Sequence, residues 1–109
     1  MVRRIALGAD DLGAVLKDEN ASLLREREIE FQDHGAQVDE AVDYPDIAEK
    51  VAYPVRDGHI DRGILVCDKG IGMAIAANKV PGVCAAMVHD PCSAERSRKS
   101  DDAQILTRG

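Results

Sequence analysis

The sequence predicts one α/β domain, a Rossmann-like three-layer α/β/α sandwich around a five-stranded parallel sheet. Three observations predict this fold class. Short apolar runs without helical period alternate with longer amphipathic stretches, which is typical of βαβ units. The strongest strand candidate, residues 61–67, ends in an uninterrupted apolar run of the kind that is buried on both faces of a parallel sheet. Finally, 109 residues suit one compact domain and are too few for two, so residues 1–109 are expected to form a single domain.

Five short apolar runs are expected to form the strands of this sheet, in the order β-α-β-α-β-α-β-α-β. Right-handed crossovers between consecutive parallel strands place helices on both faces of the sheet. The expected strands are residues 4–8, 29–32, 61–67, 83–88 and 104–107.

The first helix is expected over residues 13–27. Aliphatic residues recur there at helical spacing, and charged residues, Lys17 among them, occupy the other face, which indicates a surface helix. The apolar positions of this pattern are Leu12, Val15, Leu16, Leu23 and Leu24.

The later helices differ in character. The second contains Pro54, which should kink it or end it early because proline removes a backbone donor. Residues 73–78 are apolar on all sides and are therefore expected to form a buried helix. The fourth should begin with Asp90 as N-cap and Pro91 in its first turn and run to about residue 99. The apolar line of the second helix consists of Ile47, Val51 and Val55.

Composition and charge exclude several classes of function. A net charge of −6, with no Trp, two Tyr and one Phe, offers neither a phosphate-neutralising surface nor stacking platforms, so no nucleic-acid partner is expected. No apolar run approaches a bilayer span and no signal-peptide core is present, which predicts a cytoplasmic protein with no membrane partner. Cys67, Cys84, Cys92 and the three histidines lie at wide spacings that match neither a disulfide framework nor a zinc site, so no metal is expected.

Candidate functional residues lie at the carboxyl ends of the strands, where ligands bind in sheets of this type. The segment from Cys67 to Gly72 is the distinctive one. A thiol ends a buried strand there, and Gly70 and Gly72 then open a helix, whose backbone N–H groups and dipole stabilise a thiolate and hold an anion. Such a thiolate can act as a base. The three candidate groups are Asp10-Asp11, residues 67–72 and residues 100–102.

Each of these groups also has a purely structural interpretation. Gly70 and Gly72 could serve only to let the following helix pack close to the sheet. Asp10 and Asp11 follow the first strand, where acidic residues often cap the next helix, and spacing alone favours that interpretation. Cys84 is interpreted as a core residue.

Five segments together resemble the family of ribose-5-phosphate isomerase B and galactose-6-phosphate isomerase. The resemblance runs through nearly all of the chain, and its core is the motif G-I-G-M-x-I-A-A-N-K-V-P-G. Ser100 and its surroundings are most similar to the branch that acts on tetrulose 4-phosphates such as erythrulose 4-phosphate, which has serine where the pentose isomerases have a ring-opening histidine. The segments are residues 8–13, 42–46, 61–67, 70–82 and 89–90.

The resemblance implies a reaction and an assembly. The reaction is aldose–ketose interconversion of a small sugar phosphate through a cis-enediolate, without metal or cofactor. The assembly is a homodimer or a dimer of dimers, with active sites between subunits. A four-carbon 4-phosphate cannot close a stable furanose, so a tetrulose isomerase has no need of a ring-opening acid.

The resemblance also implies a role for individual residues. Cys67 falls on the proton-abstracting cysteine, and Lys69 and Ser100 fall on catalytic positions that hold threonine and histidine in the pentose isomerases. Asp101 falls on an asparagine that contacts the reacting oxygens. The implied substrate-binding residues, including those whose amides cradle the enediolate, are Asp10, Asp11, Tyr44, Asp68, Gly70, Ile71 and Gly72.

The sequence departs from the family pattern near the reacting atoms. Cys-Gly-Thr-Gly is replaced by Cys67-Asp68-Lys69-Gly70, in which Asp68 disfavours a thiolate and Lys69 favours it. Residues 101–102 are both aspartate and would repel an enediolate. The chain ends at Gly109, ahead of the family's phosphate-binding arginines and final helix, so the domain is expected to lack that helix.

Three functions remain open from the sequence. The first is the isomerase. The second is a catalytically impaired relative that acts as a phosphosugar-binding or dimer-forming module, favoured by the acidic residues at positions 68, 101 and 102. The third, a receiver-like signalling domain, requires a phosphoacceptor aspartate where this chain has Cys67, and is disfavoured.

Overall fold

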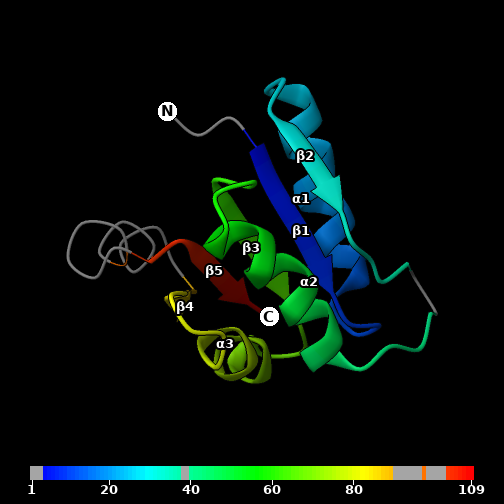
Figure 1. Ribbon diagram of the computed structural model, residues 1–109. Coiled ribbons are helices and arrows are strands. Elements are labelled where there is room, and N and C mark those ends of the chain that lie inside the picture. The colour runs from blue at the N-terminus through cyan, green and yellow to red at the C-terminus, as the bar shows by residue number, and fades with distance from the viewer. Residues whose placement is uncertain (1–3, 38–39, 90–96, 98–102) are drawn as a thin grey trace.

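The computed structural model describes residues 4–37, 40–89, 97 and 103–109. All five expected strands form, with bounds within two residues of those predicted. The expected fourth helix, which begins at Asp90, lies outside the described residues apart from Ser97. The elements are β1 (Arg4–Ala9), α1 (Ala14–Glu26), β2 (Glu30–Asp33), α2 (Tyr44–Arg56), β3 (Arg62–Val66), α3 (Ile71–Asn78), β4 (Ala85–Met87) and β5 (Ile105–Arg108) (Figure 1).

The strands form one sheet in the order β2-β1-β3-β5-β4, and every adjacent pair is parallel. The last strand, β5, therefore lies between β3 and β4. This insertion brings the end of β5 beside the segment that follows β3. There the Cys67 N–H donates to the Arg108 carbonyl (3.0 Å), and the Thr107 hydroxyl donates to the Gly70 carbonyl (2.8 Å).

Helices cover the sheet from both sides, which confirms the predicted α/β class. α2 and α3 pack against one face around Val51, Leu65, Met73 and Ile105, all of them fully buried. α1 packs against the other face, over β1 and β2. Burial of each large aliphatic side chain contributes about 1.5–3 kcal/mol, so these two clusters are the main source of stability.

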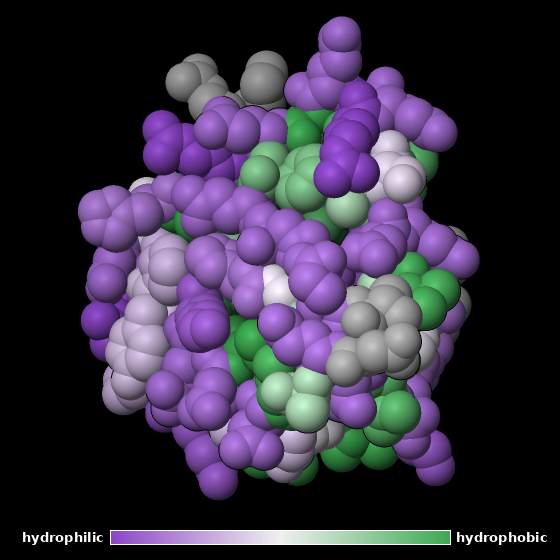
Figure 2. Space-filling model, turned by 90° about the vertical axis from the view of Figure 1, so that its right-hand side faces the viewer, coloured by the Kyte–Doolittle hydropathy of each residue, from purple (hydrophilic) through white to green (hydrophobic). Residues whose placement is uncertain are grey.

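The polar surface agrees with the sequence composition. The face shown in Figure 2 is mainly hydrophilic, and hydrophobic residues appear on it only in separate small patches. Apolar area distributed in this way is ordinary for a folded domain. Among the helices of the described ranges, none combines the length and the apolar character needed to cross a membrane.

The predicted faces of α1 are wrong in part, although Leu24 is buried as predicted. Lys17, expected on the charged outer face, is fully buried, whereas Leu12 and Val15 are more than half exposed. The buried face is narrow and consists of Ala14, Lys17, Ala21 and Leu24. A single-helix pattern cannot reveal this, because the partner that permits Lys17 to be buried comes from β2.

Two other predictions about helices are corrected. α3 is not buried on all sides: Met73 and Ala77 face the sheet, but Ile71 and Ile75 are about half exposed (49% and 56%), because only one side of the helix packs on the core. α2 continues through Pro54 to Arg56 rather than ending early. A proline near the end of a helix removes only one intrahelical hydrogen bond.

Cys84, predicted as a core residue, is exposed. It precedes β4, the edge strand of the sheet, and so lies outside the core formed by α2 and α3. Its backbone N–H donates to the Gln104 side chain (2.9 Å).

Candidate active site

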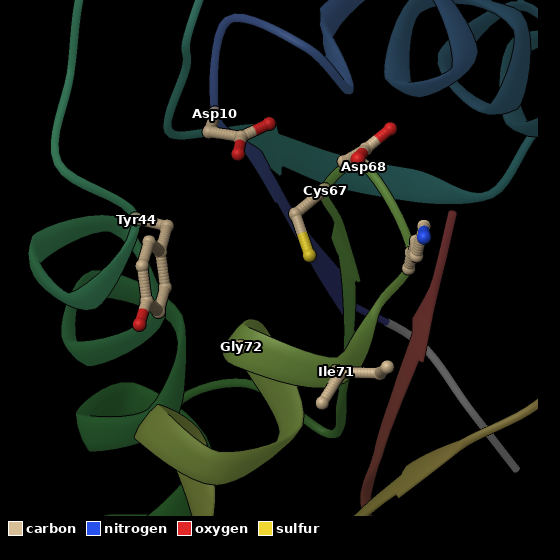
Figure 3. Close-up of a pocket in the computed structure, with 7 residues that line it drawn as sticks. Asp10, Tyr44, Cys67, Asp68, Ile71 and Gly72 are labelled. Carbon is tan, nitrogen blue, oxygen red and sulfur yellow. The ribbon is translucent and has the colours of Figure 1, made fainter.

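A pocket of about 260 Å³ opens at the carboxyl ends of β1 and β3, between the first turns of α2 and α3. This is where parallel α/β sheets bind their ligands. Figure 3 shows side chains from these separate elements converging on it. The lining residues are Asp10, Tyr44, Cys67, Asp68, Lys69, Ile71 and Gly72.

Cys67 lies directly after β3, and its thiol is nearly buried. The sulfur points into the space between Asp10, Tyr44 and the start of α3 (Figure 3). The Gly70 N–H donates to Sγ at 3.1 Å. The thiol is therefore both held by the loop that follows it and open to the pocket.

Gly70 shapes that loop. Its φ of +82° lies in the left-handed region, and a Cβ there would approach the Arg108 Cα at 2.9 Å. Gly70 is also the N-cap residue of α3, and its carbonyl accepts the Ala74 N–H (3.2 Å). The first amides of α3, including that of Ile71, have no intrahelical acceptor, so the positive end of the helix dipole borders the pocket.

Gly72 sits against the aromatic ring of Tyr44. A Cβ at this position would lie 2.9 Å from the Tyr44 Cε1 atom, so the absence of a side chain allows the ring to reach the pocket. The close-packing interpretation therefore holds for Gly70, which lies against β5, whereas Gly72 lies against Tyr44 of α2 and not against the sheet. It does not compete with a functional role, because the contacts that require glycine are the ones that form the pocket wall.

Asp10 continues from the end of β1, and its side chain is nine-tenths buried. Its N–H donates to the Val66 carbonyl (3.2 Å), and its Oδ1 accepts the Gly13 N–H (2.9 Å) just ahead of α1. Burial raises the pKa of Asp10 above its ordinary value. Hydrogen bonds from Gly13 and Leu12 oppose that effect, and the nearby charges of Asp11 and Asp68 add to it. Asp10 thus helps to form the turn before α1 and also faces the pocket.

A pH-dependent gain in stability is expected for Asp10→Asn. Because its pKa in the folded protein lies above the model value of 3.8, Asp10 stabilises the fold fully below that value, and the contribution is lost as pH rises through the raised pKa. Asparagine keeps an oxygen for the Gly13 N–H and removes the charge. Calorimetry should give a higher Tm than wild type at about pH 7 and the same Tm at about pH 3. A lower Tm near neutrality would show that ionised Asp10 is stabilised by its surroundings.

The remaining predicted site residues lie partly at the rim of the pocket and partly outside it. Asp11 is exposed and does not line the pocket, and Gly70 is buried behind it and contributes only backbone. Ser100 and Asp101 lie outside the described residues. Asp68 and Lys69 are exposed at the rim, and no ion pair joins them. Within the parts of the chain that are described, no cluster of His, Cys, Asp or Glu is arranged to hold a metal ion.

Two features of the site were not predicted. The backbone of β5 supports the loop after Cys67, and no sequence signal shows this because strand order cannot be read from apolar runs. A second pocket of about 160 Å³ adjoins the first and shares Tyr44 and Gly72 with it. It lies between α2 and α3, and its lining includes the half-exposed residues Tyr53 and Ile75.

Comparison with known proteins gives a consistent result. The model of the Ribose/Galactose Isomerase family matches residues 5–109. Ribose-5-P isomerase B of Listeria innocua is 54% identical over 106 residues, covering 97% of this chain and 72% of the relative. D-erythrulose-4-phosphate isomerase of Pectobacterium atrosepticum is 42% identical over 106 residues, covering 96% and 70%. The solved structure of Clostridium thermocellum ribose-5-phosphate isomerase B superposes with a TM-score of 0.94 at 46% identity, covering 97% of this chain and 72% of that one. The chain belongs to the ribose/galactose isomerase family.

Proposed function

We propose that this protein is a sugar-phosphate aldose–ketose isomerase and that its substrate reacts in the pocket beside Cys67. The observation that carries the proposal is the position of the Cys67 thiol, which ends a buried strand and faces Asp10 and Tyr44 next to the first turn of α3. The relatives described above are named as isomerases, which supports catalysis rather than phosphosugar binding or dimer formation alone.

The proposed reaction is a proton transfer within one substrate molecule. The Cys67 thiolate takes the proton from the carbon next to the carbonyl, and the electron pair of that C–H bond forms the enediolate double bond while the carbonyl oxygen becomes an oxyanion. Return of a proton to the neighbouring carbon, and movement of the hydroxyl proton between the two oxygens, completes the exchange of aldose and ketose. No redox partner or additional reactant is consumed.

The other pocket residues have roles that follow from their chemistry. The amides at the start of α3, those of Ile71 and Gly72, are donors for the developing oxyanion. Asp10 accepts hydrogen bonds from sugar hydroxyls, and Tyr44 contacts the sugar. Lys69, the basic residue among those that line the pocket, offsets charge on the enediolate or the phosphate. For Ser100 and Asp101, the roles near the reacting oxygens remain proposals from the family resemblance.

The proposed substrates are small sugar phosphates, either a tetrulose 4-phosphate or ribose 5-phosphate. A pocket of about 260 Å³ is slightly below the range of ~300–1,000 Å³ typical of sites for drug-sized ligands, which suits four or five carbons. Ser100 in place of a ring-opening histidine favours the four-carbon substrate.

NMR spectra of erythrulose 4-phosphate and of ribose 5-phosphate, each incubated with the protein, test this proposal by following the formation of the isomeric sugar phosphate. We expect the aldose form of the first to appear faster than the ketose form of the second. Failure to interconvert either pair would contradict the proposed function.

Restoring the family loop by Asp68→Gly together with Lys69→Thr is expected to raise kcat/KM near neutral pH. Asp68 follows Cys67 in the chain and lines the same pocket, and a carboxylate there opposes the negative charge that develops on the enediolate; a like-charge penalty of about 1 kcal/mol corresponds to roughly fivefold in rate. Steady-state kinetics of the double variant and of Asp68→Gly alone measure the effect. A slower double variant together with a faster single one would assign the stabilisation of the oxyanion to Lys69.

We further propose a cytoplasmic homodimer. Half-exposed apolar side chains line the two adjoining pockets: Tyr44, Tyr53 and Ile75 line the second, and Tyr44 and Ile71 line the first. Exposed apolar residues gathered in this way are typical of a protein–protein interface. Sedimentation equilibrium should give twice the chain mass, and Ile75→Asp should shift the equilibrium towards the monomer.

A further inference from the structure

An ion pair lies beneath α1, away from the pocket. The side chain of Lys17 is completely buried, and its Nζ donates to both oxygens of Asp33 at 2.8 and 2.7 Å, with Asp18 Oδ1 at 3.2 Å. Asp33 is the last residue of β2. Burying an ammonium group is costly even when it is paired, and apolar residues of similar size often serve stability equally well. The contacts of the pair indicate a more specific role.

From Asp33, a chain of hydrogen bonds leads to the residue that precedes Asp10. Asp33 Oδ1 accepts the Gly35 N–H (2.9 Å), and the Gly35 carbonyl accepts the Ala9 N–H (2.6 Å). The Ala36 N–H donates to the Ala9 carbonyl in turn. The carboxylate of Asp33 thus fixes the segment that holds both polar groups of the Ala9 backbone.

From the backbone of Lys17, a second series of hydrogen bonds leads to the side chain of Asp10. The Lys17 N–H donates to the Gly13 carbonyl (2.9 Å), and the Gly13 N–H donates to Asp10 Oδ1 (2.9 Å). The first series of hydrogen bonds ends at Ala9 and the second at Asp10, and these two residues are neighbours in the sequence, so the turn after β1 is held from both sides. Within the described residues, no other ion pair reaches this turn.

We propose that the buried Lys17–Asp33 ion pair is a positioning device that holds Asp10 in the pocket. The inference rests on the proposed function in one respect, since it takes Asp10 to bind substrate hydroxyls. Burial raises the pKa of Asp10, which means that the ionised side chain is held where water cannot fully solvate it. A turn without a second anchor would relax and carry this carboxylate towards solvent. Lys17 and Asp33 are thus positioning residues and not catalytic ones.

Kinetics of Lys17→Met test the proposal, with Lys50→Met, an exposed lysine of α2, as the matched control. Asp10 binds the same hydroxyls before and in the transition state, so its displacement should raise KM about tenfold and change kcat less than about threefold. Asp10→Asn should show the same split. Adding Lys17→Met to Asp10→Asn should then change KM little further, because both substitutions remove the same interaction between Asp10 and the substrate. Additive effects, or an unchanged KM in Lys17→Met, would overturn the proposal.

Amide hydrogen exchange gives a readout that does not depend on activity. In Lys17→Met, the amides of Ala9 and Gly13 should exchange at least about tenfold faster, while that of Cys67, bonded to Arg108, keeps its rate. Equal acceleration of all three would indicate general destabilisation and overturn the positioning role. If wild type converts no sugar phosphate, the proposed function fails and the exchange data alone decide this inference. If Lys17→Met does not fold, Asp33→Asn, which keeps an oxygen for the Gly35 N–H at a partly exposed site, provides the same measurements.

Discussion

Replacing Cys67 by alanine is expected to lower kcat by roughly 10²–10⁴-fold, the range that a positioned general base contributes. No other described thiol lies near the pocket, and Asp10, which faces the same space, has its carboxylate engaged by the Gly13 N–H. The fold should persist. The substitution removes a single sulfur atom beside an open pocket, and this costs less than emptying an enclosed core site.

Cys84→Ala is the matched control for this experiment. Cys84 is exposed and does not line the pocket, so the same chemical change there should leave kcat within about twofold. Turnover near the wild-type value in Cys67→Ala would place the base on another residue. Circular dichroism of both variants separates loss of chemistry from loss of fold.

Gly70→Ala is expected to cost about 2–4 kcal/mol of stability and to remove most of the activity. Two penalties combine. The φ of +82° disfavours any residue with a Cβ, and the added methyl group would lie 2.9–3.0 Å from the backbone of Arg108, which cannot move without disturbing β5. The loop would shift instead, and with it the N–H that bonds the Cys67 sulfur.

Gly58→Ala separates the two penalties. Gly58 has nearly the same φ, +81°, but a Cβ there meets nothing within 4 Å, so only the backbone cost of about 1 kcal/mol is expected, with full activity. Urea unfolding and steady-state kinetics of the two variants provide the comparison. Equal losses of stability would show that the contact with β5 does not constrain the loop.

The pattern of strands could be predicted from the sequence because each buried strand carries its own local signal. β3 is apolar from Gly63 to Val66, and Gly70 and Gly72 correctly indicated a tight start to α3. Strand order carries no such local signal. The position of β5 beside β3, and with it the contact between Arg108 and the loop after Cys67, depends on pairings between segments that are distant in the sequence.

Errors about individual faces have a similar cause. The charge of Lys17 predicts an exposed side chain. The carboxylate of Asp33 nevertheless allows Lys17 to be buried, and the two residues lie 16 positions apart in different elements. Ile75 was placed in the core because α3 is apolar, although composition cannot say how many sides of a helix are covered. Only the family resemblance predicts Tyr44 as a site residue, because neither its distance in the sequence from the other site residues nor its neighbours in the sequence indicate a pocket.

Deuterium incorporation from solvent tests the central claim, proton transfer by Cys67, most directly. Wild type and Cys67→Ala are incubated with erythrulose 4-phosphate or ribose 5-phosphate in ²H₂O, and NMR follows the two carbons that exchange the carbonyl. Wild type should introduce deuterium from solvent at the carbon that receives the proton as aldose and ketose interconvert, and Cys67→Ala should introduce none above the uncatalysed rate. Saturable binding by wild type without any exchange, or exchange that persists undiminished in Cys67→Ala, would contradict the account.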